Sequence, residues 1–320
     1  MHRITKEIRQ LISDVFATTY SLFKIMIPIL VLIKIADELG VVTVLGEWLE
    51  PVMGTLGLPS SMALVWATTM LTNLYAGILV LINTDVSLTV AQVTVLSSLL
   101  LLSHGLLLEG MISKKAGVPL WLIVLLRVGG GLMFAWLQHV YFSFSGTGQH
   151  PATVLWQNKA PVSDNYMDWA IGQGQNLISI FLVIAALITF IRVLKLLNIE
   201  RLMTWLMMPL LKVLKVSKDA AHLAVIGITL GLSYGGGLII NETKKGNLTA
   251  KDAFITVLLL NLLHSVLEDT ALVLLIGADI TMVLWARIVF SVCVMAVISQ
   301  VYTVIVSRKS GIDCSVNNAR

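Results

Sequence analysis

Eight long apolar segments decide what this chain can fold into. A helix needs ~20 mostly apolar residues to cross the hydrocarbon core of a bilayer. Segments of this kind lie at 16–36, 61–82, 89–112, 118–142, 174–196, 219–240, 253–276 and 280–307. Only 12% of the residues are charged, against ~25% in soluble domains, and the mean hydropathy is +0.89. The sequence therefore predicts an all-α polytopic membrane protein, and it excludes a cytosolic enzyme and a nucleic-acid-binding protein.

The remaining segments are amphipathic or polar. Residues 1–15 carry apolar side chains at helical spacing among charged ones, which predicts a helix lying on the membrane surface. The weaker apolar segments 41–57 and 199–216 predict helices near the membrane interface. The polar stretch 143–173 is the natural midpoint of the chain, and 308–320 is a polar tail.

The two halves on either side of that midpoint look alike. Pro51 is matched by Pro209 158 positions later, and Tyr75 is matched by Tyr234 159 positions later. Further matched pairs at an offset of 160 are His104 with His264, Arg127 with Arg287, and Glu109 with Asp269. Polar residues repeated inside apolar segments predict an internal duplication, with repeat one at 16–142 and repeat two at 174–307.

Matched loops of the two repeats differ in charge. Segment 37–60 has a net charge of −4, whereas its partner 195–218 has a net charge of +4. The loop at Lys114 and Lys115 is basic, and its partner at Asp279 is acidic. Because basic loops stay on the cytoplasmic side, the repeats are expected to cross the membrane in opposite directions.

Inversion requires an odd number of crossings in each repeat, although each repeat offers four long apolar segments. Segments 61–82 and 219–240 are interrupted by turn-prone residues, at Thr72–Gly77 and Ser233–Gly237. Ten helical residues rise ~15 Å, half of the hydrocarbon core. We therefore expect these two segments to be re-entrant hairpins, so that each repeat is a span, an interfacial helix, a hairpin and two spans, with six full spans in all.

This topology puts every basic loop on one side of the membrane. The amino and carboxyl termini, Lys114 and the basic segment 195–218 are expected on the cytoplasmic side, and the 143–173 linker on the opposite side.

Polar residues at the hairpin breaks and inside the spans are the candidate solute-binding residues, because ionisable groups in a membrane need a function or a partner. Asn261, His264 and Glu268 are expected on one face of a continuous helix. The full set comprises Thr72, Asn73, Tyr75, His104, Ser233, Tyr234, Asn261, His264 and Glu268.

Two arginines inside the spans call for acidic partners, since an unpaired charge in lipid is costly. Arg127 is expected to pair with Glu109, and Arg287 with Asp269. The sequence contains no Walker motif, dinucleotide fingerprint, paired CxxC, HExxH or GxSxG. Neither enzymatic activity nor a cofactor is therefore expected.

Several segments resemble the nucleoside-recognition, or Gate-domain, family of bacterial membrane proteins. The resemblance is carried by Thr72–Gly77, by Ser233–Gly237, and by Asn261–Thr270 followed by Gly277. The chain also resembles the core of concentrative nucleoside transporters and the gate segments of ferrous-iron transporter membrane domains. Those nucleoside transporters carry Gln-Thr-Glu on the first hairpin, where this chain has no acid, so neither their selectivity nor their coupling-ion site carries over.

The resemblance implies a multi-pass transporter of the bacterial cytoplasmic (inner) membrane that works by an elevator-like movement, often as a homo-oligomer in contact with membrane lipid. Three functions stay open. The first is transport of a small polar, nucleoside-like solute, with Na⁺ or H⁺ as coupling ion. The second is transport of a divalent metal such as ferrous iron, with His104, His264 and Glu268 as ligands. The third is a non-transporting partner in a membrane assembly.

Overall fold

The computed structural model describes residues 2–84, 86–155, 165–197, 199–214 and 216–317. The centre of the 143–173 linker, which is expected on the side opposite the cytoplasm, lies outside these residues. Among the described residues the regular secondary structure is helical, and the only bridge between extended residues joins Thr89 and Pro151. Six of its helical segments are long and apolar enough to cross a membrane. The all-α polytopic fold is therefore confirmed.

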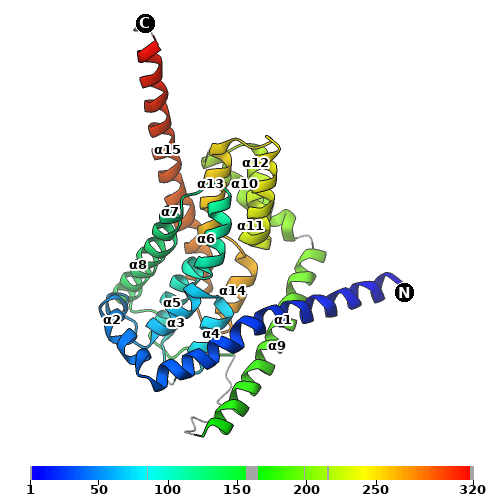
Figure 1. Cartoon of the computed structure of the whole chain (residues 1–320), viewed down its shortest axis with the longest axis vertical. Coiled ribbons are helices and arrows are strands. Elements are labelled where there is room, and N and C mark those ends of the chain that lie inside the picture. The colour runs from blue at the N-terminus through cyan, green and yellow to red at the C-terminus, as the bar shows by residue number, and fades with distance from the viewer. Residues whose placement is uncertain (1, 85, 156–164, 198, 215, 318–320) are drawn as a thin grey trace.

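Repeat one consists of a long first helix, a short second helix, a pair of short helices and two longer helical segments (Figure 1). The elements are α1 (His2–Glu38), α2 (Val41–Thr55), α3 (Met62–Leu71), α4 (Leu74–Ile82), α5 (Val90–Ser103), α6 (Leu106–Lys115), α7 (Leu120–Val124), the π-helix η1 (Leu125–Gly129) and α8 (Gly130–Ser145). Segment 1–15, expected as a separate surface helix, is continuous with the first span in α1.

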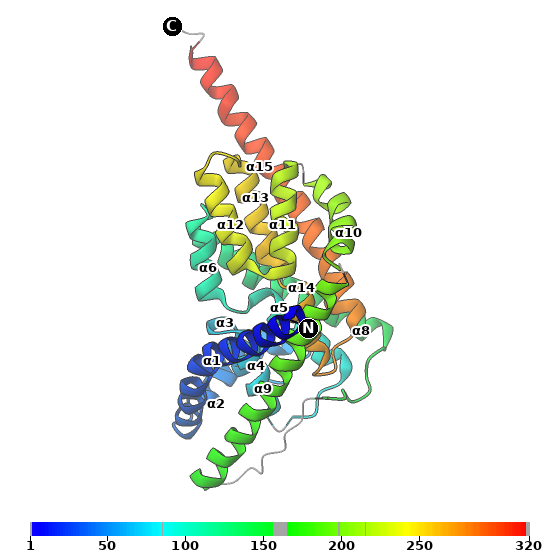
Figure 2. The same cartoon turned by 90° about the vertical axis from the view of Figure 1, so that its right-hand side faces the viewer.

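Repeat two has the same order of elements. They are α9 (Tyr166–Leu196), α10 (Ile199–Val213), α11 (Lys218–Leu230), α12 (Leu232–Lys244), α13 (Ala250–Leu262), α14 (Val266–Leu274), the π-helix η2 (Thr281–Ala286) and α15 (Arg287–Asn317). In Figure 2 helices α11, α12 and α13 stand side by side, and α15 extends beyond them. Matched positions have matched caps: Thr89 and Thr249 cap α5 and α13 with their hydroxyl groups.

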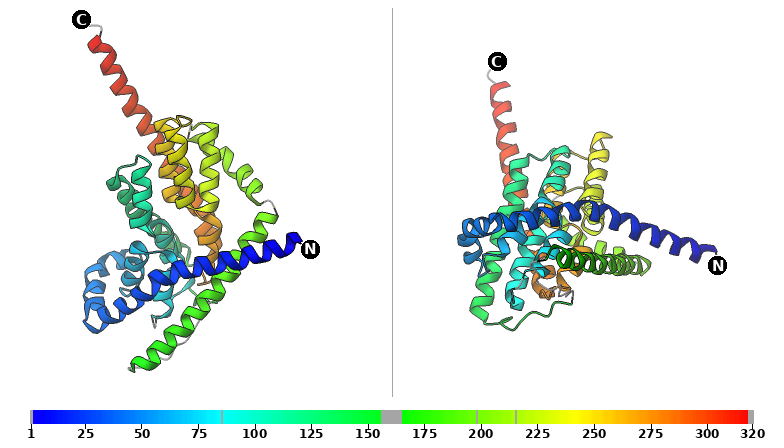
Figure 3. Two further views of the ribbon diagram at one scale, coloured as in Figure 1. Left: turned by 45° about the vertical axis from the view of Figure 1, so that its right-hand side comes forward. Right: turned by 60° about the horizontal axis from the view of Figure 1, so that its bottom comes forward.

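The segments differ in how deeply they are buried. In the most apolar 18-residue windows of Val90–Lys115 and Ala250–Leu274, 67% and 72% is buried within the molecule, whereas in those of Arg9–Ala36 and Tyr166–Leu194 only 19% and 18% is buried. Helices α1 and α9 pack against each other at the periphery, with the rings of Phe16 and Phe181 5.6 Å apart (Figure 3). The core is therefore centred on one matched helix from each repeat, α5 and α13, and buried residues of α3, α4 and α11 complete it.

Helices α3 and α4 form a packed hairpin, and so do α11 and α12. A Cβ atom on Gly77 would collide with the Thr69 hydroxyl, and one on Gly235 would lie 2.5 Å from the Gly227 Cα. The contact residues are eight apart in both hairpins, and Gly77 corresponds to Gly235. The offset of 159 inferred from Tyr75 and Tyr234 is therefore one residue too large at the hairpins.

The second hairpin turns earlier than the sequence suggested. Helix α11 ends at Leu230 and α12 begins at Leu232, so the break is at Gly231. Gly231 has φ +95°, a conformation open to glycine and costly for other residues. The expected break at Ser233–Gly237 is wrong: those residues form the first turns of α12, where Gly235 lets the helix approach α11 and Gly236 lets it approach α6.

The loops gather at two ends of the molecule. At one end the linker is bonded to two other loops: the Leu155 amide donates to the Leu275 carbonyl (2.8 Å), and the Ala152 amide donates to the Leu88 carbonyl (2.9 Å). At the same end the Asp279 amide donates to the Thr94 hydroxyl (2.9 Å). We call this the acidic end. The described part of the linker and the Asp279 loop therefore lie at the same end of the molecule.

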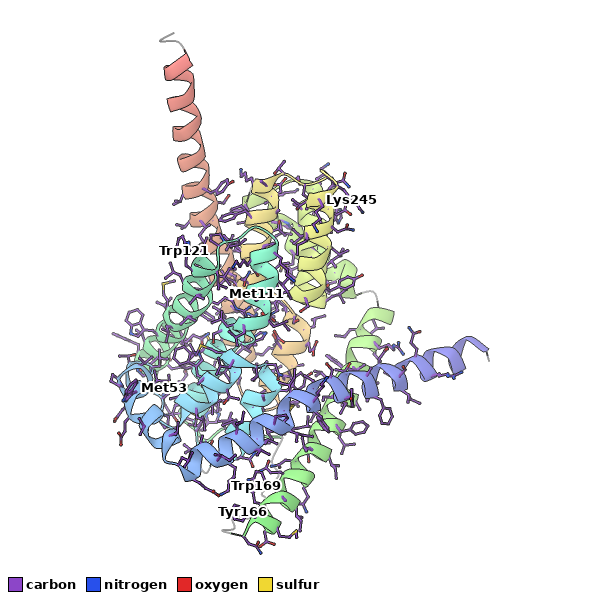
Figure 4. The ribbon with its side chains drawn as sticks, viewed as in Figure 1. Met53, Met111, Trp121, Tyr166, Trp169 and Lys245 are labelled. Atoms are coloured by element: carbon purple, nitrogen blue, oxygen red, sulfur yellow. The ribbon has the colours of Figure 1, made fainter. Side chains whose placement is uncertain are left out.

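The opposite end, the basic end, carries Lys114, Lys218, Lys244 and Lys245. The Ser217 amide donates to Asp252 (3.1 Å), which places the start of α11 beside the start of α13. Figure 4 labels Lys245 near the top of the packed helices, beside the base of the protruding α15, and Tyr166, at the start of α9, at the bottom.

The two hairpins enter from opposite ends. The Gln92 side chain, at the start of α5, donates to the Gly57 carbonyl (3.0 Å), which places the first hairpin's entry at the acidic end. The second hairpin begins at Lys218 and ends at Lys244, both at the basic end. The two repeats therefore run in opposite directions.

The hairpin contact predicts opposite effects for two alanine substitutions in α12. Gly235→Ala places a methyl group against Gly227 and is expected to destabilise the protein by roughly 1–3 kcal/mol. Gly237 has no atom within 4 Å of a Cβ position, so Gly237→Ala is expected to be neutral or to stabilise by about 0.5–1 kcal/mol through helix propensity. Thermal unfolding of the detergent-solubilised variants measures both, and equal effects would contradict the close packing.

Candidate functional site

Four helix breaks meet inside the molecule. Two are the hairpin turns at Thr72–Asn73 and Gly231, and two interrupt the buried segments α5–α6 and α13–α14. The expectation that 89–112 and 253–276 are continuous helices is therefore wrong. Helix α5 ends at Ser103 before His104 and Gly105, and α13 ends at Leu262 before His264 and Ser265.

Each hairpin tip touches the break in its own repeat. The Gly105 amide donates to the Thr69 carbonyl at 3.0 Å, which joins the first hairpin to the α5–α6 break. In repeat two, a Cβ atom on Gly231 would lie 2.8 Å from the Ser265 hydroxyl oxygen. The breaks are thus covered by protein, the condition under which irregular backbone is tolerated at membrane depth.

The residue after each histidine has a left-handed backbone. Gly105 has φ +58° and Ser265 has φ +47°, and Ser265 is the non-glycine residue with positive φ among those the structure describes. This conformation costs a serine about 1–2 kcal/mol. Strain of this kind persists where the surrounding structure enforces it, and it concentrates at functional sites.

The left-handed turns point the two histidines at each other. Their Nε2 atoms lie 3.1 Å apart, and both side chains are buried. His104 Nδ1 lies 3.2 Å from the Leu100 carbonyl, and His264 Nδ1 lies 2.6 Å from the Leu260 carbonyl. Because a carbonyl oxygen only accepts, each Nδ1 carries the proton, which leaves both facing Nε2 atoms as acceptors.

Carboxylates from both repeats flank the imidazoles. Glu109 Oε1 lies 3.2 Å from His264 Nε2 and 3.7 Å from His104 Nε2, and Asp269 Oδ2 lies 3.8 Å from His104 Nε2. Both acids are in the first turn of the helix that follows the break. Negative charge is stabilised there by the helix dipole, by roughly 0.3–1 kcal/mol at exposed sites and more when buried.

Two fully buried arginines cap the broken helices. Arg127 donates from Nε to the Leu102 carbonyl (3.0 Å), and Arg287 donates from Nε to the matched Leu262 carbonyl (3.1 Å). Each also donates to the carbonyl of the histidine in its own repeat. Both arginines lie in or directly after a π-helical segment, a feature frequent at functional sites.

The repeats differ in how the acids are paired. Arg127 Nη1 forms the expected ion pair with Glu109. The direct pair expected between Arg287 and Asp269 does not form within the described part of the chain. Arg287 Nη1 and Asp269 Oδ2 are both buried without a hydrogen-bond partner there. One acidic oxygen is therefore left facing the histidines.

The helical stripe expected from Asn261, His264 and Glu268 is also wrong, because the break separates its members. His264 meets His104, whereas Glu268 accepts a hydrogen bond from Tyr75 of the first hairpin (2.9 Å). Asn261 Nδ2 donates to Ser113 Oγ of repeat one (2.8 Å), while its Oδ1 has no partner among the described residues.

The hairpin-tip residues have more local roles. The Asn73 side chain caps α4 by accepting from the Ala76 amide (2.9 Å), and the Thr72 hydroxyl donates to the Thr68 carbonyl (2.6 Å). Ser233 and Tyr234 have exposed side chains. The structure therefore joins Tyr75, Glu268 and the two histidines in one region but does not bring Tyr234 into it.

Sequence reasoning missed three parts of this site: Glu109 as a neighbour of both histidines, Ser113 as the partner of Asn261, and the turns at Gly105 and Ser265. Gly105, directly after a histidine inside a long apolar run, was the available signal, because glycine permits a left-handed break.

Comparisons with known proteins agree with the membrane assignment and go no further. A Bacillus subtilis (strain 168) protein named "Uncharacterized membrane protein YvoD" is 25% identical over 290 residues, which cover 90% of this chain and 92% of that protein. No family model matches the chain, and no solved structure matches it. The resemblance to the nucleoside-recognition family stays a prediction.

The asymmetric pairing predicts different coupling energies in the two repeats. Glu109→Gln and Arg127→Gln are each expected to destabilise by about 3–5 kcal/mol, because each leaves a buried charge alone, and the double variant by less than their sum. Asp269→Asn with Arg287→Gln, the matched control pair, is expected to be nearly additive. Thermal unfolding of the six variants measures both cycles, and equal coupling in the two repeats would contradict the structure.

Proposed function

We propose that this chain is a secondary membrane transporter that carries a small polar solute through a site between its two hairpin tips at mid-depth in the bilayer. The observation that supports this most strongly is the convergence of four helix breaks, two from each repeat, on the facing pair His104 and His264. Broken helices from inverted repeats that meet at mid-depth are a recurring design of secondary transporters.

The arrangement of the repeats supports alternating access. The hairpins enter from opposite ends, and each one contacts the break in its own repeat. Opposite orientation of two similar units gives outward-open and inward-open states of similar energy. An elevator-like shift of one hairpin and its broken helix would expose the central residues to each end in turn.

The other proposals follow from the same arrangement. The chain acts as a carrier without catalytic activity in the bacterial cytoplasmic (inner) membrane, with both termini in the cytoplasm and H⁺ or Na⁺ as coupling ion. The exposed apolar faces of α1 and α9 support contact with lipid or with a second copy of the chain in a homo-oligomer.

A nucleoside-like solute is supported by Tyr75 and Glu268, an aromatic ring and a carboxylate in contact between the repeats. Because the side chains of Ser233 and Tyr234 are exposed, we do not include these two residues in such a site.

A divalent cation is the second candidate substrate, because ligand atoms of His104, Glu109 and His264 all lie within 4.8 Å of one another. For the non-transporting assembly partner, we expected both arginine–acid pairs, and only the Arg127–Glu109 pair is formed within the described residues.

Uptake into proteoliposomes tests the transport proposal. The purified chain is expected to accumulate at least one solute from a panel of nucleosides, nucleobases and divalent cations when a proton or sodium gradient is applied.

Tyr75→Phe, which removes the hydrogen bond to Glu268, is expected to reduce uptake about tenfold or less, in line with the net value of roughly 1.5 kcal/mol or less for such a bond. Tyr141→Phe in α8, with an exposed side chain, is the matched control and is expected to leave uptake unchanged. Folded protein that moves nothing from the panel under either gradient would count against a carrier.

A further inference from the structure

We infer that His104, His264 and Glu109 form a binding site for one first-row divalent transition-metal ion. Binding of the ion stands on the geometry alone, and its role as cargo rests on the proposed transport function. The ligand set differs from the sequence-based one, since Glu109 replaces Glu268.

The spacing of the three ligand atoms fits a tetrahedral ion. The two Nε2 atoms are 3.1 Å apart, and Glu109 Oε1 is 3.2 Å and 3.7 Å from them. A tetrahedral ion with bonds of ~2.0–2.1 Å holds its ligand atoms roughly 3.3–3.4 Å apart. The side chains therefore need shifts of only a few tenths of an ångström to surround an ion.

The atoms that face each other are all acceptors. Each Nδ1–H is directed at a backbone carbonyl, which orients the imidazole and leaves Nε2 as a neutral donor of electrons to a metal. Glu109 uses its other oxygen to pair with Arg127, so Oε1 remains directed at the histidines. Three lone pairs at these distances repel one another unless a cation lies between them.

Asp269 provides an independent observation that points to a ligand. Its side chain is 9% exposed, and Oδ2 has no hydrogen-bond partner among the described residues. This oxygen lies 3.8 Å from His104 Nε2, on the edge of the same cluster. A buried carboxylate oxygen without a partner is costly, and a cation bound beside it by His104, His264 and Glu109 would offset that cost.

The donor types of the cluster also favour a transition metal. Glu109 is paired with Arg127 through its other oxygen, and Arg127 and Arg287 donate as well to the carbonyls at the ends of α5 and α13. Two imidazoles with carboxylates suit zinc, iron(II) or manganese better than calcium or magnesium, which prefer oxygen ligands.

Titration with Co²⁺ tests the site directly in the purified, detergent-solubilised full chain. We expect one equivalent of Co²⁺ to give the intense visible absorption of tetrahedral coordination, and Zn²⁺ to abolish it by displacement. His104→Gln and His264→Gln are each expected to weaken binding at least tenfold. His222→Gln, an exposed histidine on α11, is the matched control and is expected to bind like the parent protein.

The parent protein alone can overturn the inference, whatever the stability of the variants. If the parent protein is monodisperse, unfolds cooperatively and still binds no Co²⁺, the metal site is wrong. The site is also wrong if His222→Gln loses as much Co²⁺ binding as His104→Gln. If Glu268→Gln weakened binding more than Glu109→Gln did, the assignment of Glu109 as the carboxylate ligand would be wrong.

Failure of the site and failure of the transport proposal are distinguishable. Stoichiometric tetrahedral Co²⁺ in detergent, together with vesicles that take up neither Co²⁺ nor Zn²⁺ under any gradient, would support the site and contradict its role in metal transport. Uptake of another solute by protein that binds no Co²⁺ would overturn the site and leave the carrier in place.

Discussion

The structure depends on how broken backbone is satisfied inside a membrane protein. A helix that stops at mid-depth leaves carbonyl groups without partners, each costing several kcal/mol where water is absent. In this chain Arg127 and Arg287 reach back from the following segment and donate to the carbonyls at the two breaks. Burying two guanidinium groups is itself costly. The ends of α5 and α13, with their negative dipoles, and the acids at the starts of α6 and α14 make that burial possible.

The breaks that require the arginine caps also bring together the side chains of the candidate site. Because each helix ends just before a histidine, the inverted symmetry of the repeats directs His104 and His264 at each other. The symmetry is not complete, because Glu109 is paired with an arginine and Asp269 is not. In the proposed metal site the ligands come from both repeats, so that binding of an ion would depend on the relative position of the repeats, as alternating access requires.

Much of the fold was predictable from the sequence, because apolar length, loop charge and the repeated polar residues each report on the membrane. The hairpins and the matched order of elements follow from those signals. The breaks at His104 and His264 did not follow, since a run of leucines with one glycine or serine is equally compatible with a straight helix. Whether such a helix breaks is decided by tertiary contacts, such as the Thr69 carbonyl against Gly105. The helical stripe that joined His264 to Glu268 failed for that reason.

The inverted arrangement of the repeats is the claim on which the rest depends, and side-specific labelling tests it most directly. Single cysteines at Lys114, Lys244, Glu50 and Asp279, in a background with Cys293 and Cys314 replaced by serine, would be exposed in intact cells to a membrane-impermeant thiol reagent. We expect the cysteines at Glu50 and Asp279 to react in intact cells, and those at Lys114 and Lys244 to react only after permeabilisation. Reaction of the Lys114 and Lys244 cysteines from opposite faces would contradict the inverted arrangement.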